Sequence, residues 1–351
     1  MMRRVIPFFR PSTVVAAILF LGGLAVPGLA QQSPPVAVNE SRPLRIAIDA
    51  RPVDAFDARD TAQRRFGLLE FRGGIELSSK YRDFGGISGL RIMADGSHFI
   101  ALSDRARWLR GRIVYKDGRP AGIVDAEMAP MLGPDGKPLA DRKWYDTESL
   151  TDDGAGTLYV GIERVNKIVK FDYAKFGLLA KGQPVAAPSD IDNLPKNQGL
   201  EALCMIPKGM PNAGTLIAIS ERGLDANNNI KGWLIGGTSL GAFSVKRSDG
   251  FDVTDCVIAP NGDLILLERK FSWTAGVAMR LRRIALSSVV PGATVDGKIL
   301  IAADMGFQID NMEGLAVHRE KNGDIVLTMI SDDNFSMLQR TILLQFKLVG
   351  E

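Results

Sequence analysis

Short apolar runs recur in pairs along the chain, and a turn rich in Gly and Asn or Asp separates the two runs of each pair. Asp95-Gly96, Asn261-Gly262 and Asn322-Gly323 are turns of this kind. Two apolar segments joined by such a dipeptide are the strongest short-range signal for a β-hairpin. The pattern therefore predicts strand units and not helices.

The hairpins belong to a larger unit that occurs five times. Each copy starts with a short signature of Gly, acidic and Leu residues, runs through the hairpin and ends on an acidic residue. The terminal acids, at intervals of 47 to 64 residues, are Asp104, Glu163, Glu221, Glu268 and Asp332. A period near 50 residues leaves room for about four strands per unit, which is the size of a β-propeller blade.

Two further segments with strand character lie outside the five copies, Leu44 to Ile75 and Thr341 to Leu348. We expect them to form a sixth blade together and to close the ring. The predicted fold class is therefore all-β, a single six-bladed β-propeller. A seven-bladed propeller is the next alternative, and a β-sandwich explains the hairpins but not their period.

The first thirty residues have the three parts of a secretory signal. Arg3 and Arg4 are basic, Val14 to Leu24 is apolar, and Gly28 and Ala30 are small residues before a cleavage site near Ala30. The apolar run is shorter than the roughly 20 residues that span a bilayer. We expect export to the periplasm or the cell exterior. The predicted parts are a signal peptide (1–30), a linker (31–43) and the propeller (44–351).

The charge balance also depends on this signal. The sequence has 43 Lys and Arg against 40 Asp and Glu, and three of the arginines lie within residues 1–30. The mature chain is therefore neutral, and it has no run of basic residues that would follow a phosphate backbone. We expect a monomer with no nucleic-acid partner and no stable membrane span after cleavage.

Cysteine and histidine are scarce. Cys204 and Cys256 are the only cysteines. An oxidising compartment permits a disulfide between them, but two buried thiols are the alternative, because a bridge requires Cα atoms within about 7 Å. The two histidines, His98 and His318, are expected in surface turns. A structural zinc site is not expected from this set.

Acidic residues are the candidate functional groups. The first strand of a hairpin begins at the same end of the sheet at which the second strand ends. Each blade should therefore bring a signature acid and its terminal acid to one mouth of the propeller. The signature acids are Glu148, Glu201, Asp255 and Glu313. Converging carboxylates suit Ca²⁺, which takes about six to eight oxygen ligands in irregular geometry.

Four arginines stand directly after terminal acids: Arg105, Arg164, Arg222 and Arg269. Guanidinium groups can receive a phosphate through two parallel hydrogen bonds. The alternative is that the repeated acid and arginine pairs are ion pairs that lock neighbouring blades together. Asp332-Asp333-Asn334-Phe335 departs from the repeat and is the stronger functional candidate.

Several catalytic classes lack their motifs. Ser88 follows Gly86 at the correct distance but precedes Leu90, so the nucleophile elbow Gly-x-Ser-x-Gly is absent. There is no P-loop and no dinucleotide-binding glycine motif. A hydrolase with this sequence would depend on a metal ion and a carboxylate base.

The motifs of the repeat occur in a fixed order. They are Gly85-Gly86-Ile87-Ser88-Gly89-Leu90 with Ser103-Asp104-Arg105, Asp146-x-Glu148-Ser149-Leu150 with Glu163-Arg164, Asn197-x-Gly199-Leu200-Glu201-Ala202, Leu267-Glu268-Arg269-x-Phe271, and Asn311-x-Glu313-Gly314-Leu315 with Ser331-Asp332-Asp333-Asn334-Phe335. Together, over about residues 70–348, they resemble the bacterial phytase-like domain family, often described as "esterase-like activity of phytase".

The resemblance implies an exported β-propeller that hydrolyses phosphoric esters with the help of Ca²⁺. On the matching positions we assign a catalytic role to Glu148, Glu201 and Glu313, substrate binding to Arg105, Arg164, Arg222 and Arg269, and metal binding to Asp104, Asp332 and Asp333. The Asp-Ala-x-Asp-Asp-Pro-Ala motif of true β-propeller phytases is missing, which argues against phytate.

The expected substrate is thus a small anionic ester, either a phosphate ester or a related small ester or lactone. The alternative is a non-catalytic envelope propeller that binds a ligand or a protein partner.

Overall fold

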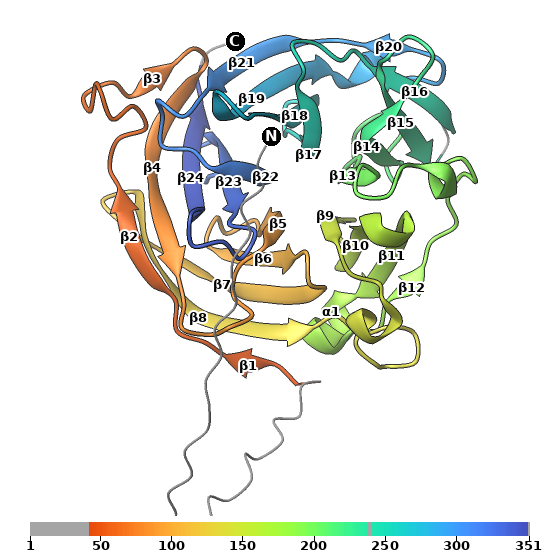
Figure 1. The fold of residues 1–351 in the computed structure, drawn as a ribbon, viewed down its shortest axis with the longest axis horizontal. Helices are drawn as coiled ribbons and strands as arrows, with labels where there is room; N and C mark the ends of the chain where they lie inside the picture. Colours follow the sequence, from red (N-terminus) through yellow and green to blue (C-terminus); the bar gives the residue numbers. More distant parts are fainter. Residues whose placement is uncertain (1–41, 238–239, 350–351) are drawn as a thin grey trace, which may run out of the picture. The chain divides into compact units, whose positions relative to one another are not determined.

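Five sheets surround a common centre, and the strands β5, β9, β13, β17 and β22 lie nearest to it (Figure 1). Their strands are antiparallel except for the pair β16 and β20. This computed structural model describes residues 42–237 and 240–349. The predicted signal peptide (1–30) and nearly all of the predicted linker (31–43) lie outside the described residues. The prediction of an all-β propeller is confirmed.

Each sheet is one blade. Blade 1 contains β5 (Ile87–Ile92), β6 (His98–Ser103), β7 (Arg107–Lys116), β8 (Arg119–Pro130) and β1 (Leu44–Arg45). Blade 2 contains β9 (Thr147–Asp152), β10 (Thr157–Ile162), β11 (Lys167–Asp172) and β12 (Gln183–Pro184). Blade 3 contains β13 (Leu200–Met205), β14 (Leu216–Leu224), β15 (Ile230–Ile235), β16 (Gly241–Val245) and β20 (Thr294–Val295).

The last two blades are built in the same way. Blade 4 contains β17 (Asp252–Ile258), β18 (Asp263–Ser272), β19 (Gly276–Ala285) and β21 (Lys298–Ala303). Blade 5 contains β22 (Asn311–Arg319), β23 (Ile325–Asp332), β24 (Thr341–Leu348), β4 (Leu69–Ser78) and β2 (Asp49–Val53), with β3 (Arg65–Phe66) paired to β4. Within the described residues, the one α-helix is α1 (Tyr173–Phe176), and no helix is long and apolar enough to cross a membrane.

The prediction of six blades is wrong, because the two segments assigned to a sixth blade complete the fifth. β24 pairs with β23 on one side and with β4 on the other, where Thr341 lies opposite Leu77 and Leu348 opposite Leu69. The hairpin β22–β23 would otherwise leave an unpaired edge, and strands from both ends of the propeller cover it. The ring therefore closes within a sheet and needs no additional blade.

Apolar side chains fill the spaces between neighbouring blades. Trp108 of blade 1 packs edge-on against Phe171 of blade 2, with ring centroids 5.1 Å apart. Between blades 3 and 4, buried Cys204 and Cys256 form a disulfide with Cα atoms 5.8 Å apart. Of the two alternatives for these cysteines, the structure has the bridge, which links two of the innermost strands.

The hairpin turns and the acidic signatures lie at opposite ends of the blades. The turns at Asp95-Gly96, Asn261-Gly262 and Asn322-Gly323 join the first and second strands of blades 1, 4 and 5. The innermost strands begin at the other end, which we term the mouth.

Candidate functional site

The innermost strand of every blade carries a β-bulge near its start. The register with the second strand shifts there, and one residue of the inner strand is left without a partner. The bulged residues, in blade order, are Ser88, Glu148, Glu201, Thr254 and Glu313. A bulge redirects its extra side chain, and bulges are common beside active sites. The five blades thus present five equivalent residues at the mouth.

A second set of equivalent residues comes from the second strands. The backbone N–H groups of Asp104, Glu163 and Glu221 donate to the carbonyls of the residues that precede the inner strands of blades 1, 2 and 3. Arg269 and Asp332 pair with the corresponding residues of blades 4 and 5, Asp252 and Asn311. The mouth of the propeller therefore has two sets of five positions.

The prediction for blade 4 is wrong by one residue, because Glu268 does not occupy the position that Asp104, Glu163, Glu221 and Asp332 occupy in the other blades. Glu268 lies opposite Val253 and does not face the mouth; its carboxylate accepts hydrogen bonds from Arg280 at 2.7 Å and Arg282 at 2.5 Å. The mouth position belongs to Arg269. Because side chains of a strand alternate between two faces, a shift of one residue exchanges the face.

The predicted signature acid of blade 4, Asp255, is also one residue away from the equivalent position in the other blades. Asp255 is fully buried, and its carboxylate accepts hydrogen bonds from the backbone N–H groups of Cys256 and Leu315, both at 2.7 Å. It fastens blade 4 to blade 5 and lies beside the bulge, which is at Thr254. Serine at the position of Glu268 in three other blades (Ser103, Ser220, Ser331) is the sequence signal that would have corrected the alignment.

Two of the bulged residues have hydroxyl side chains, and each of them donates a hydrogen bond to the neighbouring blade. The hydroxyl of Ser88 donates to the carbonyl of Thr147 at 3.1 Å, and that of Thr254 donates to the carbonyl of Met312 at 3.2 Å. Each acceptor directly precedes the bulged glutamate of the next blade. Ser88 and Thr254 thus position Glu148 and Glu313.

We call the residues at the ten mouth positions the ring. They include seven carboxyl groups and one guanidinium group. Burial raises the pKa of all seven carboxyls above the ordinary range for Asp and Glu; they are Asp104, Glu148, Glu163, Glu201, Glu221, Glu313 and Asp332. Mutual repulsion adds to this effect, as for Glu201, whose pKa is raised by burial and then by Glu148 and Glu163. The mouth therefore disfavours the ionised form of each of these carboxyl groups.

Three of these carboxylates come together closely. Glu163, Glu201 and Glu221 are buried, and one oxygen of each lies within 4.8 Å of the others. Glu163 is held in place by the backbone N–H of Gly199 at 2.8 Å and is hydrogen-bonded to Glu201. A Ca²⁺ ion with oxygen ligands at about 2.3–2.6 Å fits among oxygens with this spacing. An all-carboxylate set without Cys or His suits a hard cation.

Two aspartates on the other side of the ring have pKa values near neutrality. Burial, and then the charge of Asp332, raise the pKa of Asp104 to about 7. Burial, and then the charge of Glu313, raise the pKa of Asp332 to about 8. The buried Oδ1 of Asp104 has no hydrogen-bond partner. A buried carboxyl oxygen without a hydrogen-bond donor favours the protonated form of the group.

Arg269 is the cation of this ring. Its Nη1 donates to Oδ1 of Asn311 at 2.6 Å, and its Nη2 donates to Oε1 of Glu221 at 3.4 Å. The contact with Glu221 draws it towards the carboxylate triad. Arg269 is therefore the one predicted substrate-binding arginine that the structure places among the carboxylates.

The other three predicted arginines lie outside the ring. Arg105 stacks on the ring of Phe335 at 3.3 Å. Arg164 lies over Tyr145, at 5.0 Å. Arg222 donates to the buried carboxylate of Asp252 at 2.6 Å. Each of them is at least partly exposed, so they surround the carboxylates without joining them.

Asp333, which was predicted to bind metal, also lies outside the ring. Its Oδ1 accepts from the backbone N–H of Gly86 at 2.9 Å, and its Oδ2 accepts from Thr341 at 3.1 Å. It ties blade 5 to the start of blade 1. His318 is likewise not in a surface turn, because it lies within β22, where it is buried.

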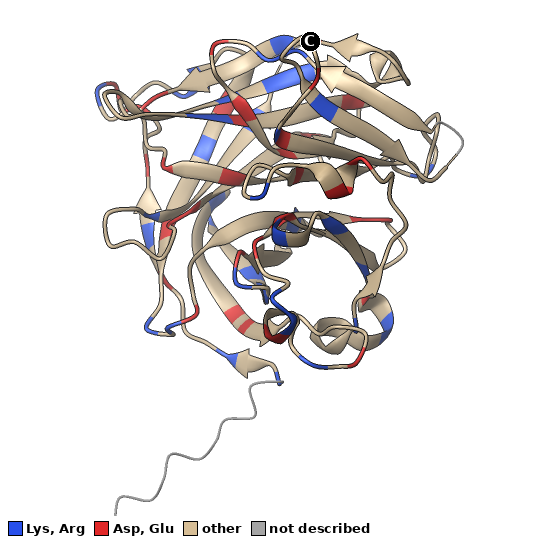
Figure 2. Ribbon diagram, turned by 45° about the vertical axis from the view of Figure 1, so that its right-hand side comes forward, with Lys and Arg blue, Asp and Glu red and all other residues tan. Residues whose placement is uncertain are grey.

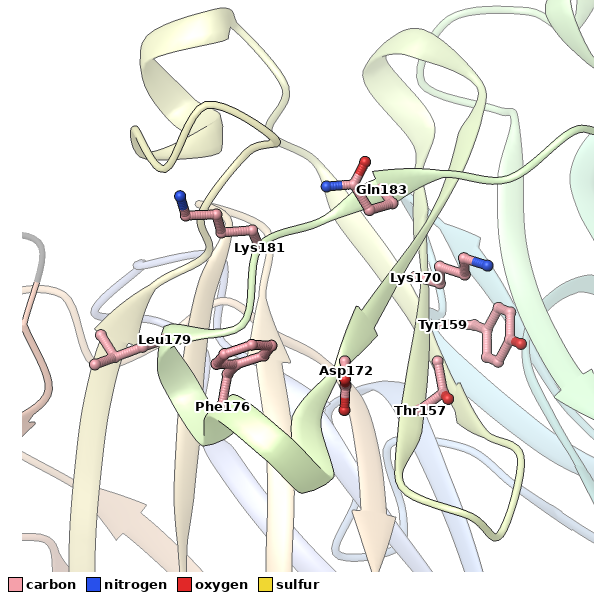
Figure 3. A pocket seen from close by; sticks show the side chains of 8 residues that line it. All are labelled: Thr157, Tyr159, Lys170, Asp172, Phe176, Leu179, Lys181 and Gln183. Carbon is pink, nitrogen blue, oxygen red and sulfur yellow. The ribbon is translucent and has the colours of Figure 1, made fainter.

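The largest-scale charge pattern is mixed, since basic and acidic segments alternate over the blades in the view of Figure 2. A cavity of about 560 Å³ lies against the outer strands of blade 2, where residues of β10, β11 and β12 line it (Figure 3). Lys170 and Lys181 lie at its edge, beside the exposed side chains of Phe176 and Leu179. It contains none of the ring carboxylates.

No curated protein sequence shows significant similarity to the chain. Among solved structures, it resembles virginiamycin B lyase from Staphylococcus aureus (9% identity, 86% of this chain and 100% of that chain, TM-score 0.39). It also resembles a luciferin-regenerating enzyme (10% identity, 86% and 96% of the two chains, TM-score 0.41). These likenesses are too distant to bear on activity.

The family model described as "Phytase-like: Esterase-like activity of phytase" matches residues 82–335, more than half of the chain. This range includes both sets of mouth residues. The chain therefore belongs to the phytase-like family.

Proposed function

We propose that the protein is an exported Ca²⁺-dependent hydrolase of phosphate esters whose reaction takes place at the mouth of the propeller. The observation that carries this proposal is the pair of carboxyl groups with pKa values near 7 and 8, Asp104 and Asp332, at the same mouth as a carboxylate triad of metal-binding spacing. Groups that titrate near the working pH are suited to general acid and base catalysis.

In this proposal Glu163, Glu201 and Glu221 hold the cation. A bound divalent cation would neutralise the charge of the phosphoryl oxygens. Arg269 contributes a fixed positive charge beside the triad, through its contact with Glu221. The sequence had assigned metal binding to Asp104, Asp332 and Asp333, and the proposed roles of Asp104 and Asp332 are instead proton transfer.

The two aspartates could supply the two proton transfers that ester hydrolysis requires. Ionised Asp104, whose pKa is about 7, accepts the proton of the water that attacks phosphorus. Protonated Asp332 gives its proton to the leaving alcohol oxygen as the P–O bond breaks. One proton is taken up and one is released, so the pair is restored when a proton passes between them. The family description supports a phosphate ester as the substrate.

Export is supported by the disulfide between Cys204 and Cys256, because such bonds persist in oxidising compartments. It agrees with the secretory signal predicted over residues 1–30.

The test is hydrolysis of a chromogenic phosphate monoester such as p-nitrophenyl phosphate, with Ca²⁺ and with chelator. We expect turnover only with Ca²⁺, and its loss in Glu201→Gln and in Asp332→Asn. Glu70→Gln, at an exposed carboxylate of β4, is the matched control and should leave turnover unchanged. Ca²⁺ binding without turnover of any phosphate or carboxylate ester would favour the alternative, a non-catalytic ligand-binding propeller.

A further inference from the structure

Large apolar side chains are exposed on the mouth-side loops of blades 4 and 5. Trp273 and Leu338 are each 94% exposed, and Met337 is fully exposed. Phe271 and Met305 are each more than half exposed. We call these five residues the apolar rim. Exposed apolar side chains that gather at one end of a protein are candidates for contact with a partner or a membrane.

The topology places the whole apolar rim at one end of the propeller. Trp273 lies in the connection from β18 to β19, and Met337 and Leu338 lie in the equivalent connection of blade 5, from β23 to β24. Both connections follow a second strand, which ends at the mouth. Met305 follows β21 and is close to Gly276, at the start of β19.

The other blades do not share this feature. The equivalent connections are short in blades 1 and 2, and in blade 3 the connection contains the polar residues Asp225, Asn227, Asn228 and Asn229. None of these three connections has a large exposed apolar residue. The apolar rim is therefore a local property of two neighbouring blades and not a consequence of the repeat.

The apolar rim stands on ordered loops. Phe271 and Trp273 pack edge-on, with ring centroids 5.2 Å apart. The second loop is held at both ends, by Asp333, which accepts from Thr341 at 3.1 Å, and by Asp310, which accepts from the backbone N–H of Arg340 at 3.1 Å. These contacts hold the apolar side chains away from the body of the propeller.

The composition of the apolar rim favours a lipid surface over a protein partner. The most exposed side chains stand at the tips of two separate loops, a shape that enters a soft interface more easily than it fills a groove. Trp is suited to the boundary between headgroups and acyl chains. Lys270 precedes Phe271, and exposed Arg105 stacks on Phe335 of the second loop. Positive charge beside these loops would favour contact with lipid phosphate groups while the apolar tips enter the acyl region.

We propose that the apolar rim docks the propeller on a phospholipid surface, with the carboxylate mouth facing the headgroups. The proposal does not depend on catalysis, because the side chains that make the contact are not ring residues. It predicts reversible binding, since the chain would insert a few side chains and not a whole helix.

The test is binding to phosphatidylcholine vesicles, followed by tryptophan emission and by co-sedimentation. Trp108 and Trp233 are buried and Trp144 is partly buried, so Trp273 dominates any change on insertion. We expect a blue shift with vesicles and quenching by lipids brominated in the acyl chain. Trp273→Phe should lose the shift but still co-sediment.

The double variant Met337→Lys and Leu338→Lys should weaken vesicle binding at least tenfold. Both side chains contact solvent and not the core, so the fold should tolerate the change. Leu240→Lys is the matched control, because Leu240 is 63% exposed but follows β15 at the end remote from the mouth.

Three outcomes would overturn the proposal. They are the absence of both the shift and co-sedimentation, unchanged binding in the double variant, and a dimer that forms without vesicles and is lost in the double variant. All measurements are made with chelator as well as Ca²⁺, and in Glu201→Gln. A failure of lipid binding is thereby distinguished from a failure of the cation site.

Discussion

Arg269 reaches from blade 4 to blade 5, where its Nη1 lies 3.6 Å from Oε1 of Glu313. The same guanidinium contacts Glu221 of blade 3 and Asn311 of blade 5. One cation thus joins three blades at a ring that otherwise contains seven carboxyl groups. The ring is a structural element and a candidate site at the same time.

Replacing this arginine should therefore destabilise the propeller. In Arg269→Met the carboxylates of Glu221 and Glu313 remain buried without their cation, which we expect to cost about 2–4 kcal/mol. The measurement is the free energy of unfolding in urea at pH 8. Arg222→Met is the control: Arg222 is more exposed and its partner Asp252 also binds Arg247, so we expect a loss below about 1 kcal/mol. Equal losses in both variants would contradict the role of Arg269.

The stability of the protein should depend on pH and on Ca²⁺ together. The folded-state pKa values of Asp104, about 7, and Asp332, about 8, are above those of the unfolded chain. The folded protein therefore binds more protons, and without a cation its stability should fall as the pH rises from about 4 to about 8. A cation that replaces protons should stabilise more strongly at high pH.

The measurement is the difference in Tm between Ca²⁺ and chelator at pH 5 and at pH 8. We expect a larger difference at pH 8, and a reduced difference in Glu201→Gln. A difference that is the same at both pH values, or absent, would show that the ring does not exchange protons for a cation.

Two glutamates that looked alike in the repeats should respond differently to the same substitution. Glu268→Gln leaves Arg280 and Arg282 without a buried anion, and we expect a loss of about 3 kcal/mol of stability. Burial, and then repulsion by Glu313 and Glu163, raise the pKa of Glu148 well above the ordinary value for Glu, so the site disfavours a charge and should accept the neutral amide of Glu148→Gln. We expect Glu148→Gln to change stability by less than about 1 kcal/mol in chelator.

The two variants should also differ in their response to Ca²⁺. The increase in Tm with Ca²⁺ should persist in Glu268→Gln and decrease in Glu148→Gln, because the negative charge of Glu148 acts on Glu201 of the carboxylate triad. The opposite pattern would place the cation in the body of blade 4 and not at the mouth.

Gly86 should be indispensable beside Asp104. Its φ is +61°, and a Cβ at this position would clash with Oδ1 of Asp104 and with the ring of Phe335. We expect Gly86→Ala to lose about 2–3 kcal/mol of stability. In Gly154→Ala, where φ is +68° and a Cβ would meet nothing within 4 Å, the loss should be near 1 kcal/mol. The difference in Tm between the two variants measures the steric clash at Gly86, because both variants share the cost of a positive φ. Equal losses in Tm would contradict the clash.

The repeating hairpins could be predicted from the sequence alone, because the chemistry of a hairpin is local. A Gly-containing turn between two apolar runs determines an antiparallel pair without help from the rest of the chain. The same locality places Glu148, Glu201 and Glu313 at one mouth, since each stands at the start of an innermost strand. Family membership followed from the order of these motifs.

The number of blades and the composition of the ring were decided by the tertiary structure. The pairing of β4 with β24 joins residues more than 250 positions apart, and no local pattern states which edge a strand will cover. In blade 4 the sequence pair Glu268-Arg269 resembles Glu163-Arg164, but the register assigns Arg269 to the mouth and Glu268 to the interior. A strand has a period of two, so only its partners determine which of two adjacent charges faces the site.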